Sequence, residues 1–319
     1  MAHLRRFRGR DVHGILLLDK PLGLSSNEAL QEAKRIVNAR KAGHTGSLDP
    51  LATGMLPICF GEATKFSQFL LDADKCYYTE MQLGIKTTTG DAEGETVEQK
   101  SFEGIDKAKL QQVMEKFRGH SKQVPSMYSA LKYEGQPLYK LAREGIEVER
   151  EPRDIHVYEI ELLDFDAASG IAAVRIHCSK GTYIRTLTED IGEQLGCGAH
   201  VAALRRESVG PFEMDDMISL ETLAEAKDFN MTGADGYLKP IQTCIDAYPK
   251  IKLTAENTQA LQFGQVVQLD RVIEPGMIQL YAPDDTFIGI GEVSEDNELT
   301  SKRLVSERHV KRSISDENY

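Results

Sequence analysis

Apolar and polar positions alternate in short, regular blocks along the first 120 residues. The stretches 13–19 and 55–60 have the length and apolar content of short buried strands. Ser25 and Glu28 have the spacing of a capping box, which predicts the start of a helix. The apolar side of this helix carries Ala29, Ala33 and Val37. Other elements predicted here are a helix at 62–71, a strand at 76–83 and an amphipathic helix at 105–117.

Similar blocks return after residue 153. Strands are predicted at 155–165 and 171–178, and in the second of these Val174 and Ile176 lie on the face opposite Arg175. The pattern continues with a helix at 182–195, a strand-like stretch at 201–204 and a helix at 220–229. Between the two halves, residues 119–152 contain three Pro, three Gly and many charges around a short helix at 138–143. This composition predicts an exposed insertion.

The C-terminal part has a different pattern of apolar and polar residues. Residues 230–249 predict a linker, and after residue 250 short strands with Gly and Pro between them predict a β-rich module of about 60 residues. We therefore divide the chain into a domain at 1–240 and a module at 250–312. The expected class of the larger domain is α+β, with a mixed central β-sheet flanked by helices.

Composition narrows the class of protein. Apolar residues make up 41% of the 319 residues, enough for a sizeable core and too many for a disordered chain. The longest early apolar run, 15–18, is too short for a transmembrane helix or a signal peptide. The five cysteines are odd in number, scattered and never spaced C-x-x-C, which disfavours a disulfide framework or a zinc finger. We expect a cytoplasmic protein without a membrane segment.

The formal net charge of −12 disfavours a general nucleic-acid coat, but the charge is uneven. Residues 1–48 hold nine basic and four acidic residues, 175–206 hold five and three, and 302–312 hold five and one. By contrast, 284–298 contain six acidic residues and no basic one. Basic clusters are often solvated tails, and they also fit a local nucleic-acid groove.

Cofactor and metal motifs are absent from the sequence. The glycines at 196 and 198 resemble the start of a dinucleotide fingerprint, but Val201 occupies the place of the last glycine. No phosphate-binding P-loop, H-E-x-x-H or G-x-S-x-G occurs, and the His and Cys residues do not have metal-ligand spacing. We predict neither a metal nor a cofactor.

The most informative segment is the loop at 43–57, GHTGSLDPLATGMLP. Its glycines permit backbone conformations that side chains forbid, and Pro50 stiffens the turn after Asp49. A carboxylate on a rigid turn beside an imidazole suits nucleophilic catalysis. An aspartate before a proline is also a common turn in which the side chain bonds its own backbone. Spacing alone leaves both readings open.

Five segments of the chain resemble the TruB family of pseudouridine synthases. They read GILLLDKPLGLSSN (14–27), RKAGHTGSLDPLATGMLPICFGEATKF (40–66), PSMYSALK (125–132), HCSKGTYIRTL (177–187) and GCGAHVAALRR (196–206). The resemblance is strong from about residue 9 to 210 and weaker to about 310. It implies an enzyme that converts the uridine at position 55 in the T-arm loop of tRNA to pseudouridine. That isomerisation breaks a glycosidic bond, turns the base and rejoins it through carbon, so the resemblance implies no cofactor and no metal.

The resemblance assigns the chemistry to Asp49, which matches the family's catalytic aspartate. Burial would raise the pKa of this carboxyl from about 3.9, and Arg185, which matches the family's arginine, would oppose that rise. Without the motif around it, Arg185 reads as a surface residue on the first turn of a helix. Whether the carboxylate attacks the base or the anomeric carbon of the sugar stays open.

Other matched residues would surround the flipped base that such chemistry requires. Tyr77 matches the family's active-site tyrosine, which offers an aromatic face and a phenol that could help to move the proton from the ring carbon. Tyr183 and Leu204 match positions that wall the pocket, and His44 matches a residue that fills the gap left by the base. Residues matched in a supporting role are Lys20, Pro21 and Asp91. From the residues alone, Tyr77 and Leu204 also fit a core, and His44 fits a hydrogen-bonded turn.

The chain departs from the family at residue 88. The family commonly reads T-D-T-x-D-x-x-G there, whereas Thr88 replaces the first acid and Asp91 keeps the second. The insertion at 119–152 resembles a segment that closes over the T-arm. Three arginines in or next to it could meet phosphates, and five acidic neighbours dilute this charge. The arginines are Arg143, Arg150 and Arg153. The C-terminal module resembles a PUA-like RNA-binding barrel.

Two other functions remain open beside the isomerase. The three basic segments also fit a protein that assists tRNA folding without catalysis, and both activities can coexist in one chain. An aspartyl-nucleophile hydrolase is disfavoured because the sequence lacks a metal or phosphate site. We expect a monomer whose partner is the T-arm stem-loop of tRNA.

Overall fold

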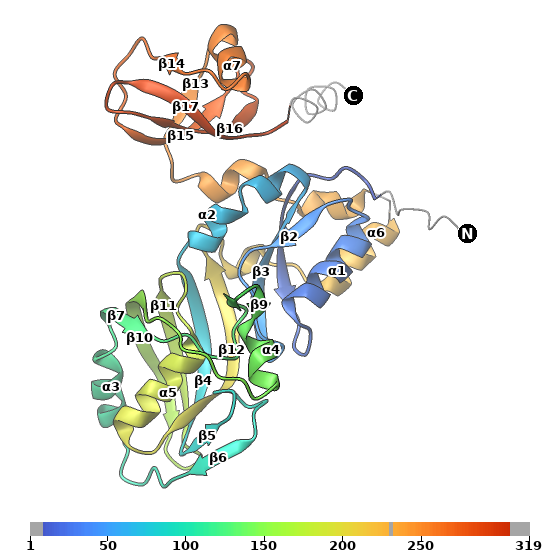
Figure 1. Ribbon diagram of the computed structural model, residues 1–319. Coiled ribbons are helices and arrows are strands. Elements are labelled where there is room, and N and C mark those ends of the chain that lie inside the picture. Colours follow the sequence, from blue (N-terminus) through green and yellow to red (C-terminus); the bar gives the residue numbers. More distant parts are fainter. Residues whose placement is uncertain (1–8, 230–231, 307–319) are drawn as a thin grey trace.

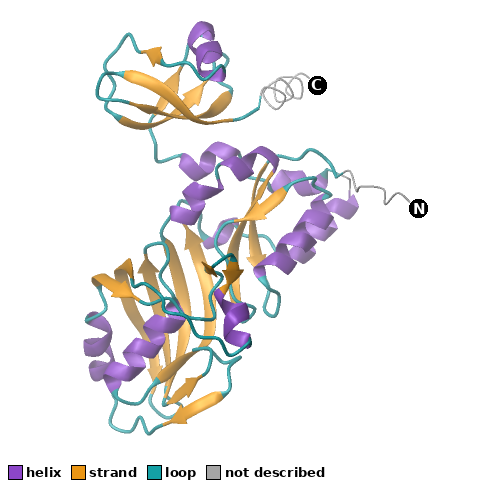
Figure 2. Ribbon diagram, viewed as in Figure 1, coloured by secondary structure: helices purple, strands orange, loops and turns teal. Residues whose placement is uncertain are grey.

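A mixed sheet of eight strands forms the centre of the larger domain (Figures 1 and 2). The computed structural model describes residues 9–229 and 232–306. The strands are β1 (Gly14–Lys20), β2 (Ala42–His44), β3 (Ala52–Phe60), β4 (Lys75–Leu83), β7 (Gly119–Gln123), β10 (Arg153–Asp166), β11 (Ile171–Cys178) and β12 (Ala199–Val209). Their order is β1-β3-β12-β4-β11-β10-β7, with β2 beside β3. Strands β3 and β12 run parallel, and the other neighbours run antiparallel.

Four helices cover this sheet. Helices α1 (Ser26–Val37) and α6 (Leu220–Phe229) pack together near β1 and β2, while α3 (Lys107–Glu115) and α5 (Ile184–Leu195) pack together near β10, β4 and β12 (Figure 1). The buried faces of the helices and the sheet form one core that includes Leu16, Phe60 and Ile176. The predicted capping box is confirmed, because Ser25 accepts from the backbone N–H of Glu28 and the Glu28 carboxylate accepts from the backbone N–H of Ser25.

The remaining elements of the larger domain are short. They comprise η1 (Gly61–Lys65), α2 (Ser67–Asp72), β5 (Ile85–Thr87), β6 (Thr96–Gln99), β8 (Lys132–Tyr133), β9 (Gln136–Pro137), α4 (Leu138–Arg143), η2 (Met214–Asp216), η3 (Gly233–Tyr237) and η4 (Ile241–Ile245). Strands β5 and β6 form one hairpin, and β8 and β9 form another. Around α4, Met127, Leu138 and Leu141 form a small core separate from the main one.

A five-stranded sheet forms the C-terminal module. Its elements are β13 (Lys250–Lys252), α7 (Ala255–Gln262), β14 (Val267–Gln268), β15 (Gly276–Tyr281), β16 (Phe287–Val293) and β17 (Glu298–Leu304). The module contacts the larger domain through a shared apolar cluster in which Phe66 packs against Phe287, with ring centroids 5.7 Å apart. The expected β-rich module is therefore present, and its likeness to a PUA barrel stays a prediction.

Four predicted elements differ from the structure. The helix predicted at 62–71 is split at Phe66 into η1 and α2, and Phe66 is fully buried. Strand β12 is much longer than the predicted stretch at 201–204. In its continuation Arg205 pairs with Asp19, and Arg206 donates to the carbonyls of Met55 and Gly46. The predicted exposed insertion starts later than residue 119, because 119–123 form the edge strand β7 of the central sheet.

The linker predicted at 230–249 was also wrong for the described residues 232–249. Lys239 exchanges two backbone hydrogen bonds with Ile15 of β1, at 2.9 and 2.8 Å. In η4, Ile241, Cys244 and Ile245 are buried in the cluster that joins the module to the larger domain. The spacing of these three residues places them on one side of a helical turn, which the glycines and prolines nearby obscured in the sequence.

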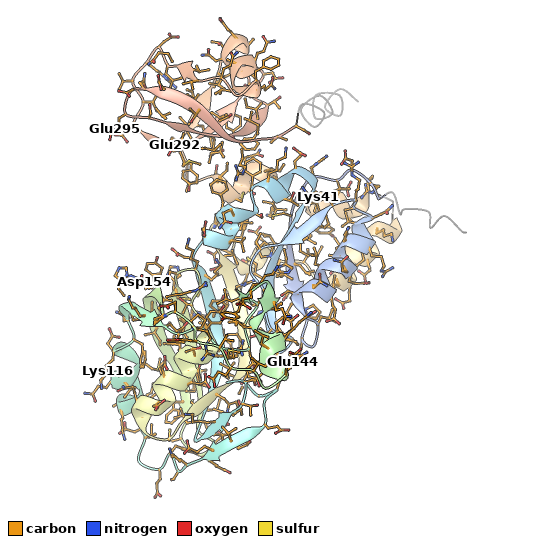
Figure 3. All side chains as sticks on the ribbon, in the orientation of Figure 1. Lys41, Lys116, Glu144, Asp154, Glu292 and Glu295 are labelled. Carbon is orange, nitrogen blue, oxygen red and sulfur yellow. The ribbon has the colours of Figure 1, made fainter. Side chains whose placement is uncertain are left out.

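Ion pairs neutralise several cations of the basic segments. Arg10 pairs with Asp235 at 2.6 Å, and Arg40 pairs with Asp11 at 2.9 Å. Residues 1–8 and 307–312, which belong to two of the basic segments, lie outside the described part of the chain. The acidic stretch is on the C-terminal module, where Figure 3 labels Glu292 and Glu295. Within the described ranges, no helix is long and apolar enough to cross a membrane.

Candidate active site

The turn that carries Asp49 lies between β2 and β3 and is attached to the start of α1. The Ser26 hydroxyl donates to the carbonyl of Leu48 at 2.9 Å and accepts from the N–H of Leu48 at 2.7 Å. The N–H of Ala52 donates to the carbonyl of Asp49 at 3.0 Å, which closes the turn. The loop predicted at 43–57 is thus shorter than expected, because β2 and β3 take both of its ends. Asp49 is held on a rigid backbone, with its side chain 40% exposed.

Lys20 lies beneath this turn and is fully buried. Its ammonium donates to the carbonyls of Pro21 and Leu24, at 3.0 and 2.6 Å, and to that of Pro50 at 3.4 Å. The N–H of Gly23 also donates to the carbonyl of Pro50, at 2.9 Å. Lys20 and Pro21 therefore belong to a loop that is bonded to the turn next to Asp49. Burial lowers the pKa of Lys20 to about 8, against the opposing effect of Asp49.

Replacing Lys20 by Met should loosen the turn that carries Asp49. The carbonyls of Pro21 and Leu24 would lose the Lys20 donor, and that of Pro50 would keep only the N–H of Gly23. Misplacing a reacting group by about 1 Å can reduce turnover by about 100-fold. We expect kcat/KM to fall by about 10- to 100-fold. Because the pKa of Lys20 is lowered in the folded state, the unfolded chain binds more protons above about pH 8, so stability from this group rises with pH there. Urea unfolding of the variant should show a weaker rise between pH 8 and 10.

Lys75 offers a matched control for this prediction. It is also buried, its pKa is also lowered to about 8 by burial, and its ammonium donates to carbonyls at the end of α2, including that of Leu71 at 2.8 Å. Lys75→Met should lower the free energy of unfolding while kcat/KM changes less than about twofold. Equal losses of activity in the two variants would contradict the role of Lys20 beneath the turn.

Arg185 connects the turn to α5. Its Nε lies 2.9 Å from Oδ2 of Asp49 and 3.7 Å from Oδ2 of Asp91. The two remaining nitrogens donate to the carbonyls of Thr89 and Tyr128, at 2.8 and 2.7 Å. The side chain is only 6% exposed, so the expectation that isolated residues suggested, a surface arginine, was wrong. One guanidinium thus orients the Asp49 carboxylate and ties three segments of the chain together.

Burial and the neighbouring charges shift the pKa of Asp49 in opposite directions. Burial raises the pKa of the Asp49 carboxyl above its ordinary value, Arg185 lowers it, and Asp91 raises it again. Lys20 contributes a further lowering from below. A less solvated carboxylate with a raised pKa is a stronger nucleophile than one in water, provided that a cation keeps it ionised. Arg185 is that cation, and its Nε is in direct contact with the Asp49 carboxylate.

Asp91 is buried in the turn after β5. Its carboxylate accepts from the Thr89 hydroxyl and from the N–H of Glu93, the latter at 3.1 Å. The neighbouring Thr88, where the family commonly has an acid, accepts from the N–H of Glu95 at 3.1 Å through its hydroxyl. A threonine hydroxyl can replace a carboxylate as acceptor in such a turn. The departure at 88 therefore preserves the turn that presents Asp91 to Arg185.

Tyr77 and Arg206 lie on two neighbouring strands of the central sheet. They are register partners on β4 and β12, and both are buried. The Arg206 guanidinium donates to the carbonyls of Met55 and Gly46, at 2.7 and 3.0 Å. Burial raises the pKa of the Tyr77 phenol, while Arg206 opposes the rise. Gly54, with a φ of 92°, is required here because a side-chain carbon at this position would lie 2.3 Å from the backbone oxygen of Arg206.

The other predicted residues lie on β2, on β12 and just before α5. His44 ends β2, is half-buried, and has its pKa lowered by burial and by Arg206. Leu204 is buried on β12, paired with Ala52 of β3 and Thr79 of β4. Tyr183 precedes α5, where its backbone exchanges hydrogen bonds with the Gln123 side chain at 3.1 and 2.7 Å. Arg185 directly contacts Asp49 and Asp91, while His44, Leu204 and Tyr183 lie on neighbouring elements.

The chain matches known protein families over residues 34–305. Residues 34–184 match the TruB family pseudouridylate synthase (N terminal domain), and 185–248 match the tRNA pseudouridylate synthase B C-terminal domain. Residues 249–305 match the C-terminal domain of pseudouridine synthase II TruB. The tRNA pseudouridine synthase B of Coxiella burnetii (strain RSA 493 / Nine Mile phase I) is 52% identical over 307 residues, 96% of this chain and 98% of the relative. That of Stutzerimonas stutzeri (strain A1501) is 51% identical over 306 residues, 96% and 99% of the two chains.

The chain belongs to the TruB family of pseudouridine synthases. The family predicted from the five segments is thereby confirmed. Among solved structures, a chain of a Cbf5-Nop10-Gar1 complex superposes with a TM-score of 0.71 and 27% identity, covering 93% of this chain and 86% of that one. A chain of an H/ACA RNP bound to a substrate RNA containing 2'-deoxyuridine gives 0.70 and 25%, with the same coverage. These likenesses confirm the predicted α+β class with its mixed central sheet.

Sequence reasoning missed several residues of this TruB-family site. Arg206 was counted only as one charge in a basic segment, although it is 1% exposed and joins β12 to the catalytic loop. The two carbonyls that Arg185 binds, those of Thr89 and Tyr128, carry no side-chain signal at all. The signal that could have found Arg206 is its place directly after Arg205 in the sequence. Adjacent strand residues face opposite sides of a sheet, so the two arginines must point in opposite directions. In the described ranges, no group of three or more His, Cys, Asp or Glu residues could hold a metal ion.

Proposed function

We propose that this enzyme converts the uridine at position 55 in the T-arm loop of tRNA to pseudouridine, with Asp49 as the nucleophile. The observation that carries the proposal is the contact between Asp49 and the buried Arg185, at 2.9 Å, on a turn held by Lys20 and Ser26. The relatives at about half identity over nearly the whole chain are named tRNA pseudouridine synthase B. Their name supports tRNA as the substrate.

The proposed reaction exchanges one bond of the uracil for another. The bond between N1 and the anomeric carbon breaks, the base turns, and a bond forms between C5 and the same carbon. C5 then loses its proton and N1 gains one, so the product is an isomer and no redox partner is needed. Asp49 forms a covalent adduct either with the base ring or with the anomeric carbon, and both routes use the same orientation by Arg185.

Base flipping gives the remaining residues their roles. A stacked uridine must leave its loop to reach Asp49, at a cost of a few kcal/mol. Tyr77 offers the face on which the flipped base stacks, Tyr183 and Leu204 wall the pocket, and His44 fills the gap in the RNA. The lowered pKa of His44 keeps its imidazole neutral, so it can stack without carrying its own charge into the loop. The phenol of Tyr77 is the group proposed to help move the proton from C5.

Exposed cations in and next to the insertion are proposed to meet RNA phosphates. Arg143 and Arg153 are exposed, whereas Arg150 is 3.4 Å from the Glu147 carboxylate and is less available. We expect the logarithm of tRNA affinity to fall by about 0.7 to 0.9 per phosphate contact for each log unit of salt. Filter binding between 50 and 500 mM salt measures this slope. An affinity that does not change with salt would contradict phosphate contacts by the insertion.

A role in tRNA folding is proposed beside catalysis. Opening the T-arm loop to reach one uridine requires contacts with the rest of the arm, and these contacts do not involve the Asp49 carboxylate. A refolding assay on misfolded tRNA should therefore give equal rates with wild type and Asp49→Asn. Loss of the assistance in the variant would tie it to catalysis and remove the second role.

Mapping of pseudouridine in unmodified tRNA transcripts tests the main proposal. Purified enzyme is incubated with the transcript, and modified uridines are located by chemical labelling and primer extension. Pseudouridine at position 55 alone is the expected result. Modification at other positions, or none, would contradict the proposed substrate site.

A further inference from the structure

Gln123 is a buried glutamine at the point where the central sheet ends and the rest of the insertion begins. It is the last residue of β7, and only 4% of it is exposed. Its Nε2 donates to the carbonyl of Tyr183 at 3.1 Å, and its Oε1 accepts from the N–H of Tyr183 at 2.7 Å. An amide offers a donor and an acceptor in one plane, so this pair fixes both the place and the orientation of the Tyr183 backbone.

Tyr183 occupies a position where a helix is normally capped by its own side chain. It is the N-cap residue of α5, yet its side chain makes no capping hydrogen bond. Ser, Thr, Asp and Asn are preferred there, because their short side chains accept from the first free N–H groups of a helix. The start of α5 is held from outside instead, through Gln123. A local rule is thus broken at a residue that is proposed to wall the pocket.

The backbone that Gln123 holds leads directly to the cation beside Asp49. Arg185 is two residues after Tyr183, in the first turn of α5, and contacts the Asp49 carboxylate at 2.9 Å. The Tyr183 carbonyl also accepts from the N–H of Leu187 at 3.0 Å, so it belongs to this first helical turn. A shift of that carbonyl would therefore move the turn that carries Arg185.

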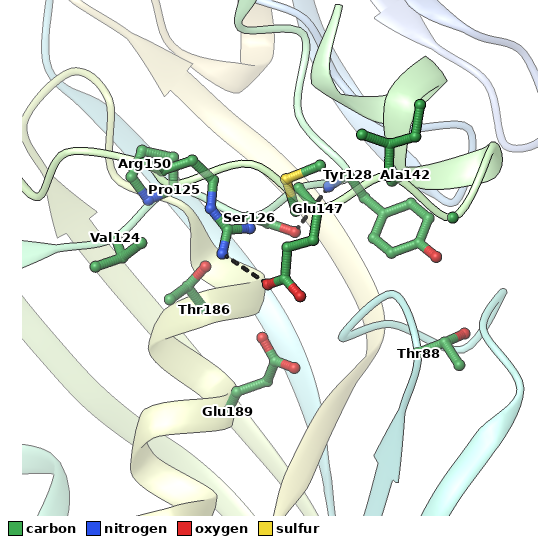
Figure 4. Close-up of a pocket in the computed structure, with 13 residues that line it drawn as sticks. Thr88, Val124, Pro125, Ser126, Tyr128, Ala142, Glu147, Arg150, Thr186 and Glu189 are labelled. Carbon is green, nitrogen blue, oxygen red and sulfur yellow. Dashed lines mark hydrogen bonds and ion pairs between the residues drawn. The ribbon is translucent and has the colours of Figure 1, made fainter. Parts of the chain in front are cut away.

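The chain after Gln123 follows the same end of α5. Arg185 donates to the carbonyl of Tyr128 at 2.7 Å. Val124, which directly follows Gln123, lines the same cavity as Tyr128 and as Thr186 of α5 (Figure 4). The segment 123–128 is thus bonded to the start of α5 at two points, and the Gln123 amide is the first of them.

We propose that Gln123 is a positioning residue for the reaction at Asp49. Its amide holds Tyr183 at the pocket wall and, through the first turn of α5, holds Arg185 against the carboxylate. It acts through these two residues and touches no substrate itself. The inference rests on the proposed function for the reaction and adds a residue on which its rate depends. A purely structural glutamine would support the sheet edge without affecting the chemistry.

Gln123→Met tests this role, because the side chain keeps its length and loses both hydrogen bonds. Misplacing a reacting group by about 1 Å can cost about 100-fold, so we expect the single-turnover rate to fall by about 10- to 100-fold. Affinity for tRNA should stay near that of wild type, since no proposed phosphate contact is altered. Gln82→Met is the matched control, because the amide of Gln82 on β4 also donates to two carbonyls, those of Leu83 and Ser169. It should keep the wild-type rate.

The pH profile shows whether the loss passes through Arg185. Arg185 lowers the pKa of Asp49, so a displaced guanidinium should let that pKa rise and move the acid limb of kcat/KM to higher pH. Gln123 carries no charge of its own, so a moved limb reports on Arg185. An unmoved acid limb, or an equal loss of rate in Gln123→Met and Gln82→Met, would overturn the proposal.

Gln123→Glu keeps the proposal testable where the Met variant folds poorly. A protonated carboxyl donates and accepts as the amide does, whereas an ionised one has no hydrogen for the Tyr183 carbonyl. Burial raises the pKa of such a carboxyl, and above that pKa the protonated fraction falls by about tenfold per pH unit. The rate of this variant relative to wild type should therefore rise as the pH falls. A constant ratio over the pH range in which both proteins stay folded would contradict the role of the two hydrogen bonds.

Failure of the main proposed function would look different. Wild-type enzyme would then form no pseudouridine at position 55 in the mapping experiment. Failure of the present inference leaves that activity in place, with Gln123→Met as active as its control.

Discussion

An Asp49→Asn variant is expected to lose pseudouridine formation by about 10^4-fold or more, which is the scale seen when a covalent nucleophile is removed. The amide cannot ionise and cannot form the adduct with the base or the sugar. Its oxygen can still accept from Nε of Arg185, which is 2.9 Å from the carboxylate in the wild type, so the turn should keep its shape. Affinity for tRNA should change less than about threefold, because no proposed phosphate contact is altered.

Single-turnover assays with unmodified tRNA measure the chemical step, and filter binding measures affinity. Asp164→Asn is a matched control, because this exposed aspartate on β10 accepts from the N–H of Phe165 and an amide can do the same. It should retain wild-type turnover. Turnover by Asp49→Asn within about tenfold of wild type would show that another group is the nucleophile.

Arg185→Met should reduce both activity and stability. The change leaves the carboxylates of Asp49 and Asp91 without their cation, and breaking a buried ion pair costs about 3 kcal/mol or more in free energy of unfolding. The carbonyls of Thr89 and Tyr128 also lose their donor. We expect kcat to fall by about 100-fold or more, because the nucleophile loses both its orientation and its counter-charge.

The pH profile separates the electrostatic role of Arg185 from its structural one. Arg185 lowers the pKa of Asp49, so without it this pKa should rise further above its ordinary value and the acid limb of kcat/KM should move to higher pH. Arg185→Lys keeps the charge and should leave the acid limb closer to that of the wild type. The double variant Arg185→Met with Asp91→Asn should regain stability without regaining activity. An unmoved acid limb in Arg185→Met would contradict the assigned charge effect.

Local patterns along the chain were sufficient for many elements. The alternation at 171–178 predicted β11 with its bounds, and the capping box at Ser25 and Glu28 predicted the start of α1. Such patterns depend on neighbours within a few residues, so they can be seen in one dimension. The same holds for the glycines and Pro50 around Asp49, whose conformational limits are local.

Charged residues in buried places could not be placed from the sequence. Arg206 counted only as one charge of a basic segment, yet it is buried because the distant carbonyls of Met55 and Gly46 accept its hydrogens. The length of β12 and the packing of η4 were missed for the same reason, since their partners lie far along the chain. Burial of a polar group depends on its partners, and the partners are known only once the chain has folded.

The sequence by itself determined the family and most of the helices and strands, and it predicted Asp49 as the reactive carboxylate. These follow from residue types in a fixed order and from local periodicity. Only the tertiary structure decided that Asp49 and Asp91 share one guanidinium, and that Arg206 joins β12 to the loop that carries Asp49. Each of these joins segments separated by more than 25 residues, and such contacts are set by how the sheet and its helices pack.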